Sequence, residues 1–165
     1  MFDSIIKGSV WKYGNNINTD IISPPQYMEL SIEEAAKYAM SPVDPDFSKK
    51  FKKDDILVAG YNFGPGSSRE TSPLSLKYLG VDVIIAKSFA RIFYRNCINV
   101  GILVLECPET DNIEDRDVLE INYRDGIIKN VTKNEEYTCS KIPQHLVRLI
   151  DLGGLVPYLK QLKNS

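Results

Sequence analysis

The sequence predicts an α/β fold, a mixed sheet with flanking helices, on three observations. Apolar runs of strand length occur at residues 56–63, 81–86 and 102–105. Residues typical of helices separate these runs, and the connections are short, which favours βαβ units and a partly parallel sheet. Beyond residue 117, apolar and polar residues alternate on both sides of an Arg124-Asp125-Gly126 turn, which predicts an antiparallel addition.

The elements before the first long apolar run are expected to be short. Residues 9–13 predict a strand and residues 14–20 a turn-rich loop. Ser31, followed three residues later by Glu34, predicts a capping box and a helix that runs to Pro42. A short helix at 46–51 and a polar turn at 53–55 should follow. The basic residues of this region are expected to face solvent: Lys49, Lys50, Lys52 and Lys53.

The middle of the chain alternates strands and helices. The strand at 56–63 leads through a glycine turn into a helix at 71–79, which Gly80 is placed to end. After the strand at 81–86, Ser88 is expected to cap a helix over 89–96, and Gly101 to end that helical region before the strand at 102–105.

The last third is expected to form a hairpin over residues 117–131 and a further strand at 136–139. Pro143 should begin a helix that Gly153-Gly154 breaks, before a final short helix at 155–162. No internal repeat or linker is evident, so one domain over residues 1–165 is expected.

Composition argues against several classes of protein. Hydrophobic residues make up 43% and charged residues 25%, as in ordinary globular domains. A net charge of −2 gives no electrostatic reason to expect nucleic acid or an anionic membrane as a partner. No apolar run approaches the roughly 20 residues that span a bilayer, and the N-terminus does not resemble a signal peptide.

The three cysteines, Cys97, Cys107 and Cys139, predict neither a disulfide framework nor a metal site. Their number is odd, their spacing is wide, and His145 is the only histidine. Each is expected to be a small buried hydrophobe, in a reducing cytoplasmic location.

One turn carries the densest chemistry: Gly64-Pro65-Gly66-Ser67-Ser68-Arg69-Glu70. A glycine turn before a helix lets an anion approach unpaired backbone N–H groups. The turn lacks the Gly-x-Ser-x-Gly pattern of a nucleophile elbow, the lysine of a P-loop and the dinucleotide fingerprint, and one histidine gives a Ser-His-Asp triad no support. Local chemistry leaves two readings open: an anion site, or a capped helix with an Arg69–Glu70 ion pair.

Two other stretches carry polar or charged groups. In residues 88–96 the aromatic side chains are expected to pack in the core, whereas Arg91 and Arg95 share a helix face and could support the glycine turn or contact carboxylates. Asn18-Thr19-Asp20 is a polar cluster that side-chain capping of a turn would explain.

In their order and spacing these motifs resemble the aconitase superfamily, and more closely its stand-alone small subunits, as in 3-isopropylmalate dehydratase and archaeal-type homoaconitase. The resemblance covers about residues 8–106, whereas the C-terminal third agrees only in length and pattern. It implies the swivelling β/β/α domain of the aconitase type. It is carried by the glycine turn and by three further segments: Val10-Trp11-Lys12-Tyr13-Gly14, Asn18-Thr19-Asp20-Ile21-Ile22 and Ala86-Lys87-Ser88-Phe89-Ala90-Arg91-Ile92-Phe93-Tyr94-Arg95-Asn96.

The resemblance implies the small subunit of a heteromeric hydro-lyase that isomerises a hydroxy-dicarboxylic acid, foremost 3-isopropylmalate in leucine biosynthesis. Its partner would be a large subunit that carries a [4Fe-4S] cluster, the Lewis acid for the leaving hydroxyl, while this chain binds no metal. The isolated subunit could form a homo-oligomer. The alternatives are a homoaconitase or methylated-malate (dimethylmalate) dehydratase small subunit, and a non-catalytic anion-binding regulatory module.

The resemblance also assigns roles within the turn. Ser67 matches the family's base, which takes the proton next to a carboxylate. The backbone N–H groups of Ser68 and Arg69 would stabilise its alkoxide, and the Arg69 side chain, beside Gly66, would bind a substrate carboxylate. Thr71 departs from the histidine that often follows this motif.

A second set of residues matches the family's substrate-selecting loop: Tyr27, Met28, Glu29 and Leu30. Relatives that bind an additional substrate carboxylate place an arginine in this loop. Here the loop has Glu29, and no arginine precedes Arg69. This departure favours a substrate with an apolar substituent, such as isopropylmalate or a methylated malate.

Overall fold

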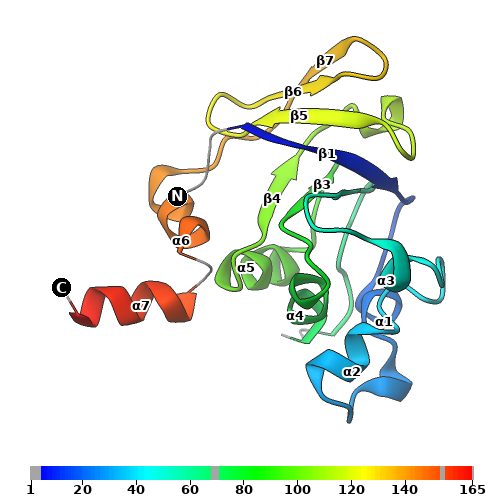
Figure 1. The fold of residues 1–165 in the computed structure, drawn as a ribbon, viewed down its shortest axis with the longest axis vertical. Coiled ribbons are helices and arrows are strands. Elements are labelled where there is room, and N and C mark those ends of the chain that lie inside the picture. Colours follow the sequence, from blue (N-terminus) through cyan, green and yellow to red (C-terminus); the bar gives the residue numbers. More distant parts are fainter. Residues whose placement is uncertain (1–4, 68–70, 153–154, 165) are drawn as a thin grey trace.

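The computed structural model describes residues 5–67, 71–152 and 155–164, and its strands form one seven-stranded mixed sheet in the order β4-β3-β2-β1-β5-β6-β7 (Figure 1). The strands are β1 (Ile5–Lys12), β2 (Ile56–Val58), β3 (Val83–Ala86), β4 (Leu103–Glu106), β5 (Val118–Asn122), β6 (Ile127–Asn130) and β7 (Glu135–Thr138). The helices are α1 (Thr19–Ile22), α2 (Ile32–Ala36), α3 (Phe47–Lys50), α4 (Thr71–Tyr78), α5 (Arg91–Asn99), α6 (Gln144–Asp151) and α7 (Leu155–Asn164), with 3₁₀ turns at Pro25–Tyr27 and Thr110–Asn112.

Strand β1 joins two halves of different character. Its residues 5–9 pair antiparallel with β5, and its residues 10–12 pair parallel with β2. Beyond β2 the strands β3 and β4 continue in parallel, whereas β6 and β7 extend the other half as an antiparallel meander. In Figure 1 the meander lies at the opposite end of the molecule from α2. The predicted mixed α/β fold is confirmed.

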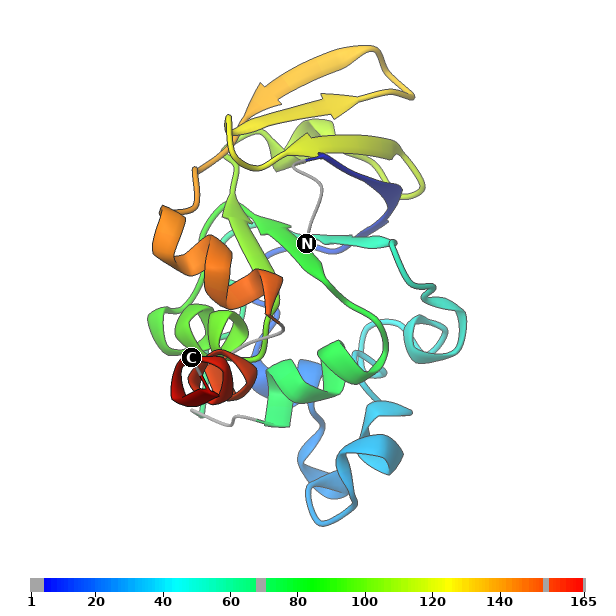
Figure 2. The ribbon, with the colours of Figure 1, turned by 60° about the vertical axis from the view of Figure 1, so that its left-hand side comes forward.

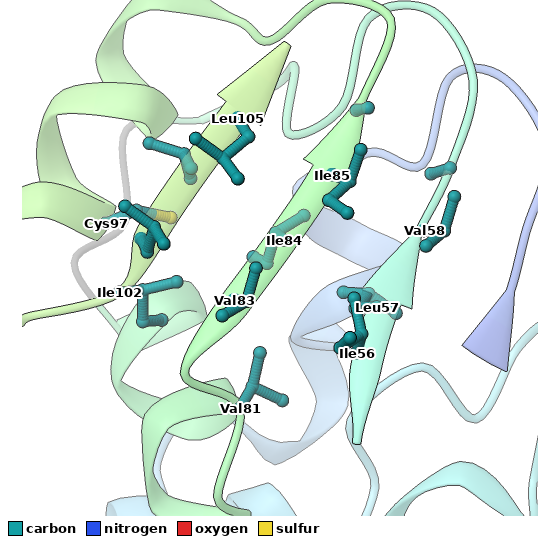
Figure 3. Close-up of a cluster of buried hydrophobic side chains, with 14 of the residues drawn as sticks. Ile56, Leu57, Val58, Val81, Val83, Ile84, Ile85, Cys97, Ile102 and Leu105 are labelled. Atoms are coloured by element: carbon teal, nitrogen blue, oxygen red, sulfur yellow. The ribbon is translucent and has the colours of Figure 1, made fainter. Parts of the chain in front are cut away.

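The core lies along the parallel half. The residues of β2 and β3, and the first three of β4, are buried, as expected for strands covered on both faces (Figure 3). Cys97 of α5 joins this cluster, and Cys107 is also buried, whereas Cys139 is half-buried. On β5, buried and partly exposed residues alternate, as in a sheet with one face toward solvent.

Helices position the edge of the sheet where the parallel strands end. Helix α5 packs against β4, and α6 and α7 pack against α5 (Figure 2). Helix α4 lies beside α2 and α5. Within the described residues, no helix is both long enough and apolar enough to cross a membrane.

Several predicted boundaries need correction. Strand β1 begins at Ile5 rather than residue 9. Strand β2 ends at Val58 rather than residue 63, because from Gly60 on the backbone hydrogen bonds go to loop residues. Ser31 caps α2 as predicted, since its Oγ accepts from the N–H of Glu34 at 3.2 Å, but α2 ends at Ala36. Met40, buried and with φ at +64°, donates its N–H to Ile21 and turns the chain away from the helical path.

The predicted cap of α5 is wrong. Helix α5 begins at Arg91 with Ala90 as its N-cap, and the hydroxyl of Ser88 instead accepts a hydrogen bond from the N–H of Asn62 at 2.8 Å.

Helix α1 was not predicted, because its residues fall at the end of the expected turn-rich loop. The remaining helices and strands were predicted to within a few residues, and the four lysines at 49–53 are exposed as expected. Residues Gly153 and Gly154, the predicted break between α6 and α7, lie outside the described residues.

Candidate active site

The glycine turn follows β2 at the edge of the sheet where the parallel strands end. Gly64 and Gly66 have positive φ angles of +89° and +119°, a region that other residues rarely adopt. A Cβ on Gly64 would overlap the ring of Phe93, and a Cβ on Gly66 would lie 2.6 Å from Oγ1 of Thr19. Both the backbone angle and the close approach therefore require glycine at these two positions.

On one side, the turn is hydrogen-bonded to the segment between β1 and α1. The N–H of Gly64 donates to the carbonyl of Ile17, and the N–H of Thr19 donates to the carbonyl of Pro65, both at 2.8 Å. Asn18 begins α1, because its Oδ1 accepts from the N–H of Ile21 at 2.9 Å. The capping role predicted for the polar cluster is therefore confirmed for Asn18.

On the other side, the turn is bound to the segment that leads into α5. The N–H of Phe63 donates to the carbonyl of Ser88 at 3.0 Å, and the N–H of Ala90 donates to the carbonyl of Phe63 at 2.9 Å. The buried ring of Phe63 packs edge-to-face on Phe89 and Phe93. The predicted packing role of these aromatic residues is confirmed, and the three sequence motifs meet at one place.

Between the turn and α5 lies a cavity of about 200 Å³, whose lining includes Thr19, Gly66, Ser67, Arg91, Phe93 and Asn96. Ser67 is exposed, so its hydroxyl is accessible from solvent. Ser68, Arg69 and Glu70 lie outside the described residues, so the roles expected of Ser68 and Arg69 stay predictions.

The cavity contains polar groups besides Ser67. Arg91 lines it, whereas Arg95, one turn later on α5, does not. Asn96 and Thr19 also line it. The sequence predicted a place near the glycine turn for both arginines, and the structure puts only Arg91 in the lining of the cavity. Nothing in the sequence indicated that Thr19 lies beneath Gly66.

Lys87, in the segment that leads into α5, already has an acidic partner. Lys87 forms an ion pair with Asp111 at 2.5 Å and lies over the ring of Tyr61, with Nζ 4.6 Å from the ring centre. The hydrogen bond that Lys87 donates to the Asp111 carboxylate raises the pKa of Lys87. Arg91, in contrast, makes no ion pair or hydrogen bond through its side chain with the described part of the chain. It is a cation available to an anionic ligand in the cavity.

The predicted substrate-selecting loop lies beside the cavity rather than in its lining. Tyr27 stacks on Tyr38 at 3.7 Å between ring centres, which fixes one end of the loop. Met28 and Leu30 are 51% and 45% exposed, and Glu29 is exposed. Tyr27, Met28 and Leu30 line a second, smaller hollow together with Thr71. Ser67 lines the first cavity and Thr71 the second, smaller one.

The cysteines do not fit as ligands of an iron–sulfur cluster. Cys97 is fully buried in α5, and burial raises the pKa of its thiol well above the ordinary value. Burial likewise raises the pKa of Cys107, and it raises that of Cys139 to about 11. Cluster ligands are thiolates, which these environments disfavour. Within residues 5–67, 71–152 and 155–164, no group of three or more His, Cys, Asp or Glu side chains could hold a metal ion.

Comparison with known proteins gives one consistent family. Residues 6–110 match the family described as the aconitase C-terminal domain. The chain is 50% identical to the 3-isopropylmalate dehydratase small subunit 1 of Archaeoglobus fulgidus, over 94% of this chain and 98% of that protein. It is also 50% identical to the isopropylmalate/citramalate isomerase small subunit of Methanocaldococcus jannaschii, over 96% and 95% of the two chains.

A solved structure agrees with these relatives. The crystal structure of the 3-isopropylmalate dehydratase from Methanocaldococcus jannaschii superposes with a TM-score of 0.91 at 43% identity, covering 96% of this chain and 95% of that one. At this identity the likeness extends beyond the fold to the whole length of the sequence.

The close approach at Gly66 predicts a stability effect. Replacing Gly66 with alanine should lower the free energy of unfolding by roughly 1–3 kcal/mol, because a Cβ meets both a positive φ and the Thr19 hydroxyl. Urea unfolding of the isolated chain, followed by circular dichroism, measures this. Gly14→Ala is the matched control, since a Cβ there meets no atom within 4 Å, and it should change stability by less than about 0.5 kcal/mol. Equal losses in both variants would contradict the geometry.

Proposed function

This chain belongs to the aconitase C-terminal domain family, and from that premise we propose that it is the small subunit of a hydro-lyase of the 3-isopropylmalate dehydratase type. The observation that carries the proposal is the position of Ser67 on a cavity that three separate sequence motifs build together. The reaction removes water from a hydroxy-dicarboxylic acid and returns it with the hydroxyl on the neighbouring carbon. It serves leucine biosynthesis.

Ser67 is the base in this proposal. It accepts the proton from the carbon next to a substrate carboxylate and returns a proton to the intermediate when water is added back. A serine hydroxyl is a weak base unless its alkoxide is stabilised by preorganised donors. The positive φ of Gly66 and the start of α4 at Thr71 favour such donors on the intervening segment, where the N–H groups of Ser68 and Arg69 are proposed to act.

The substrate carboxylates need cations. The proposal assigns one carboxylate to the side chain of Arg69, as the family resemblance implies. The cavity with Ser67 on its wall supports this, because a carboxylate there would hold the neighbouring carbon near the base.

A second chain completes the site. We place the [4Fe-4S] cluster on a large subunit, because the three cysteines of this chain are in environments that disfavour thiolates. The free cysteines and the biosynthetic role favour a cytoplasmic, reducing location.

The residues of the loop favour a substrate with an apolar substituent. Met28 and Leu30 offer exposed apolar surface, and Glu29 would repel an additional carboxylate. Isopropylmalate fits this description, and so does a methylated malate. The second candidate is supported by the printed name of the Methanocaldococcus jannaschii relative, which includes citramalate. Homocitrate-type acids with a third carboxylate fit less well.

A regulatory module that only binds anions is the competing proposal from another class. It would use the same helix start and require no large subunit. A neighbouring gene for a large subunit with three cluster cysteines would favour the enzyme.

Reconstitution tests the proposed function directly. The chain alone should show no turnover, and it should gain activity when combined anaerobically with its large subunit, iron and sulfide. A panel of isopropylmalate, citramalate, dimethylmalate and homocitrate then ranks the substrates by kcat/KM. Activity of the iron-free chain alone, or carboxylate binding with no turnover in the presence of the large subunit, would refute the enzyme.

The assignment of Ser67 as the base predicts the effect of replacing it with alanine. Ser67→Ala should lower kcat at least about a thousandfold, because general-base catalysis typically contributes factors of 10² to 10⁴, while the two subunits still co-elute in size-exclusion chromatography. Ser41→Ala removes a hydroxyl from outside the cavity and should leave kcat unchanged. Near-normal turnover by the Ser67 variant would reject the assigned base.

The assignment of residues 27–30 as the substrate-selecting loop predicts that replacing Glu29 changes the preference between substrates. Glu29→Arg should raise kcat/KM for homocitrate-type acids relative to isopropylmalate by about tenfold or more, because an arginine–carboxylate pair replaces a repulsion. Glu136→Arg makes the same charge change on β7, at the other end of the molecule, and should leave the ratio unaltered (Figure 1). An unchanged ratio in the Glu29 variant would remove this loop from substrate selection.

A further inference from the structure

A residue that lines the cavity has a buried hydroxyl without a hydrogen-bond partner among the described residues. Thr19 is 3% exposed, and its Oγ1 has no partner within the described part of the chain. Leaving a polar group buried and unpaired costs free energy, and valine would fill the same space without that cost. The packing of the isolated chain therefore does not explain why threonine, rather than valine, occupies this position.

The position of this hydroxyl is fixed by its surroundings. The backbone N–H of Thr19 donates to the carbonyl of Pro65 at 2.8 Å, which ties the start of α1 to the glycine turn. Its Oγ1 lies where a Cβ of Gly66 would come within 2.6 Å, so the oxygen sits directly beneath the turn. Ser67 is the next residue of the turn, and both side chains line the same cavity.

We propose that Thr19 is a positioning residue whose hydroxyl donates a hydrogen bond to Oγ of Ser67 when that oxygen carries negative charge. The inference rests on the proposed role of Ser67 as base. A donor to the charged form of a group lowers its pKa, so Thr19 makes Ser67 easier to deprotonate. In the resting chain the donor is unpaired, and it is satisfied when the charge develops, which is how a preorganised site lowers a barrier.

Two other uses of the hydroxyl make different predictions. A hydroxyl that bound a substrate carboxylate directly would act mainly on KM. A hydroxyl that only shaped the turn would act on stability and would leave the pH dependence of the reaction unchanged. The positioning role acts on kcat and on the pKa of the base.

The experiment is a pH–rate profile of the reconstituted enzyme with Thr19→Val. We expect kcat to fall about ten- to a hundredfold, as for loss of a hydrogen bond to a charged group, with KM changed less than threefold. Loss of a donor raises the pKa of the base, so the decline of kcat/KM toward low pH should begin at a higher pH. Thr19→Ser, which keeps the hydroxyl, should restore most of kcat and the original profile.

Thr110→Val is the matched control. Thr110 is also fully buried, its Oγ1 likewise lacks a partner among the described residues, and it lies outside the cavity lining. This variant should keep the wild-type kcat and pH profile. If Thr19→Val does not fold, Thr19→Ala tests the same loss of the donor without a bulky side chain.

The outcomes separate this inference from the proposed function. Wild-type kcat and pH profile in Thr19→Val, beside an inactive Ser67→Ala, would overturn the role of Thr19 and leave the enzyme intact. A rise in KM at constant kcat would also overturn it, in favour of direct substrate binding. An inactive wild-type complex would instead refute the proposed function, and this inference with it.

Discussion

The site depends on a backbone constraint: the glycine turn is hydrogen-bonded on both sides to segments distant in sequence. The N–H of Gly64 is bound to the loop after β1, and Phe63 exchanges two backbone hydrogen bonds with the segment before α5. Backbone contacts of this kind fix a position without depending on side-chain rotamers. They place Ser67 on the wall of a cavity even though it lies in an exposed turn, where a side chain would otherwise sample many positions.

The rest of the fold supports this constraint from a distance. Strand β1 is shared by both halves of the sheet. The antiparallel meander of β5 to β7 therefore stabilises the strand that leads into the loop hydrogen-bonded to Gly64. Helices α6 and α7 pack on α5, which carries Arg91 and Asn96 into the cavity. The C-terminal third, which contributes no residue to the cavity lining as described, thus holds the two elements that flank the turn.

The sequence predicted the elements well because their signals are local. Apolar runs marked the parallel strands, an alternating pattern marked β5 and β6, and Ser31 with Glu34 marked the cap of α2. It failed where tertiary contacts decide. Ser88 looked like a helix cap, but its hydroxyl accepts from Asn62, just before the glycine turn, and from Gly60 on the predicted strand is hydrogen-bonded to loops. Thr19 had a sufficient local explanation, and only its position beneath Gly66 shows the buried, unpaired hydroxyl.

The exposure of Ser67 argues for the division of the proposed enzyme between two chains. A serine in contact with water gains little from nearby donors, because water competes for the same hydrogen bonds and screens charge. The same donors act strongly once water is excluded and the local dielectric falls. This chain holds Ser67 and Thr19 on a cavity that is open to solvent, so in the proposed enzyme the partner that carries the cluster would also have to close the site. In the proposed enzyme, assembly is therefore the step that turns a surface serine into a base.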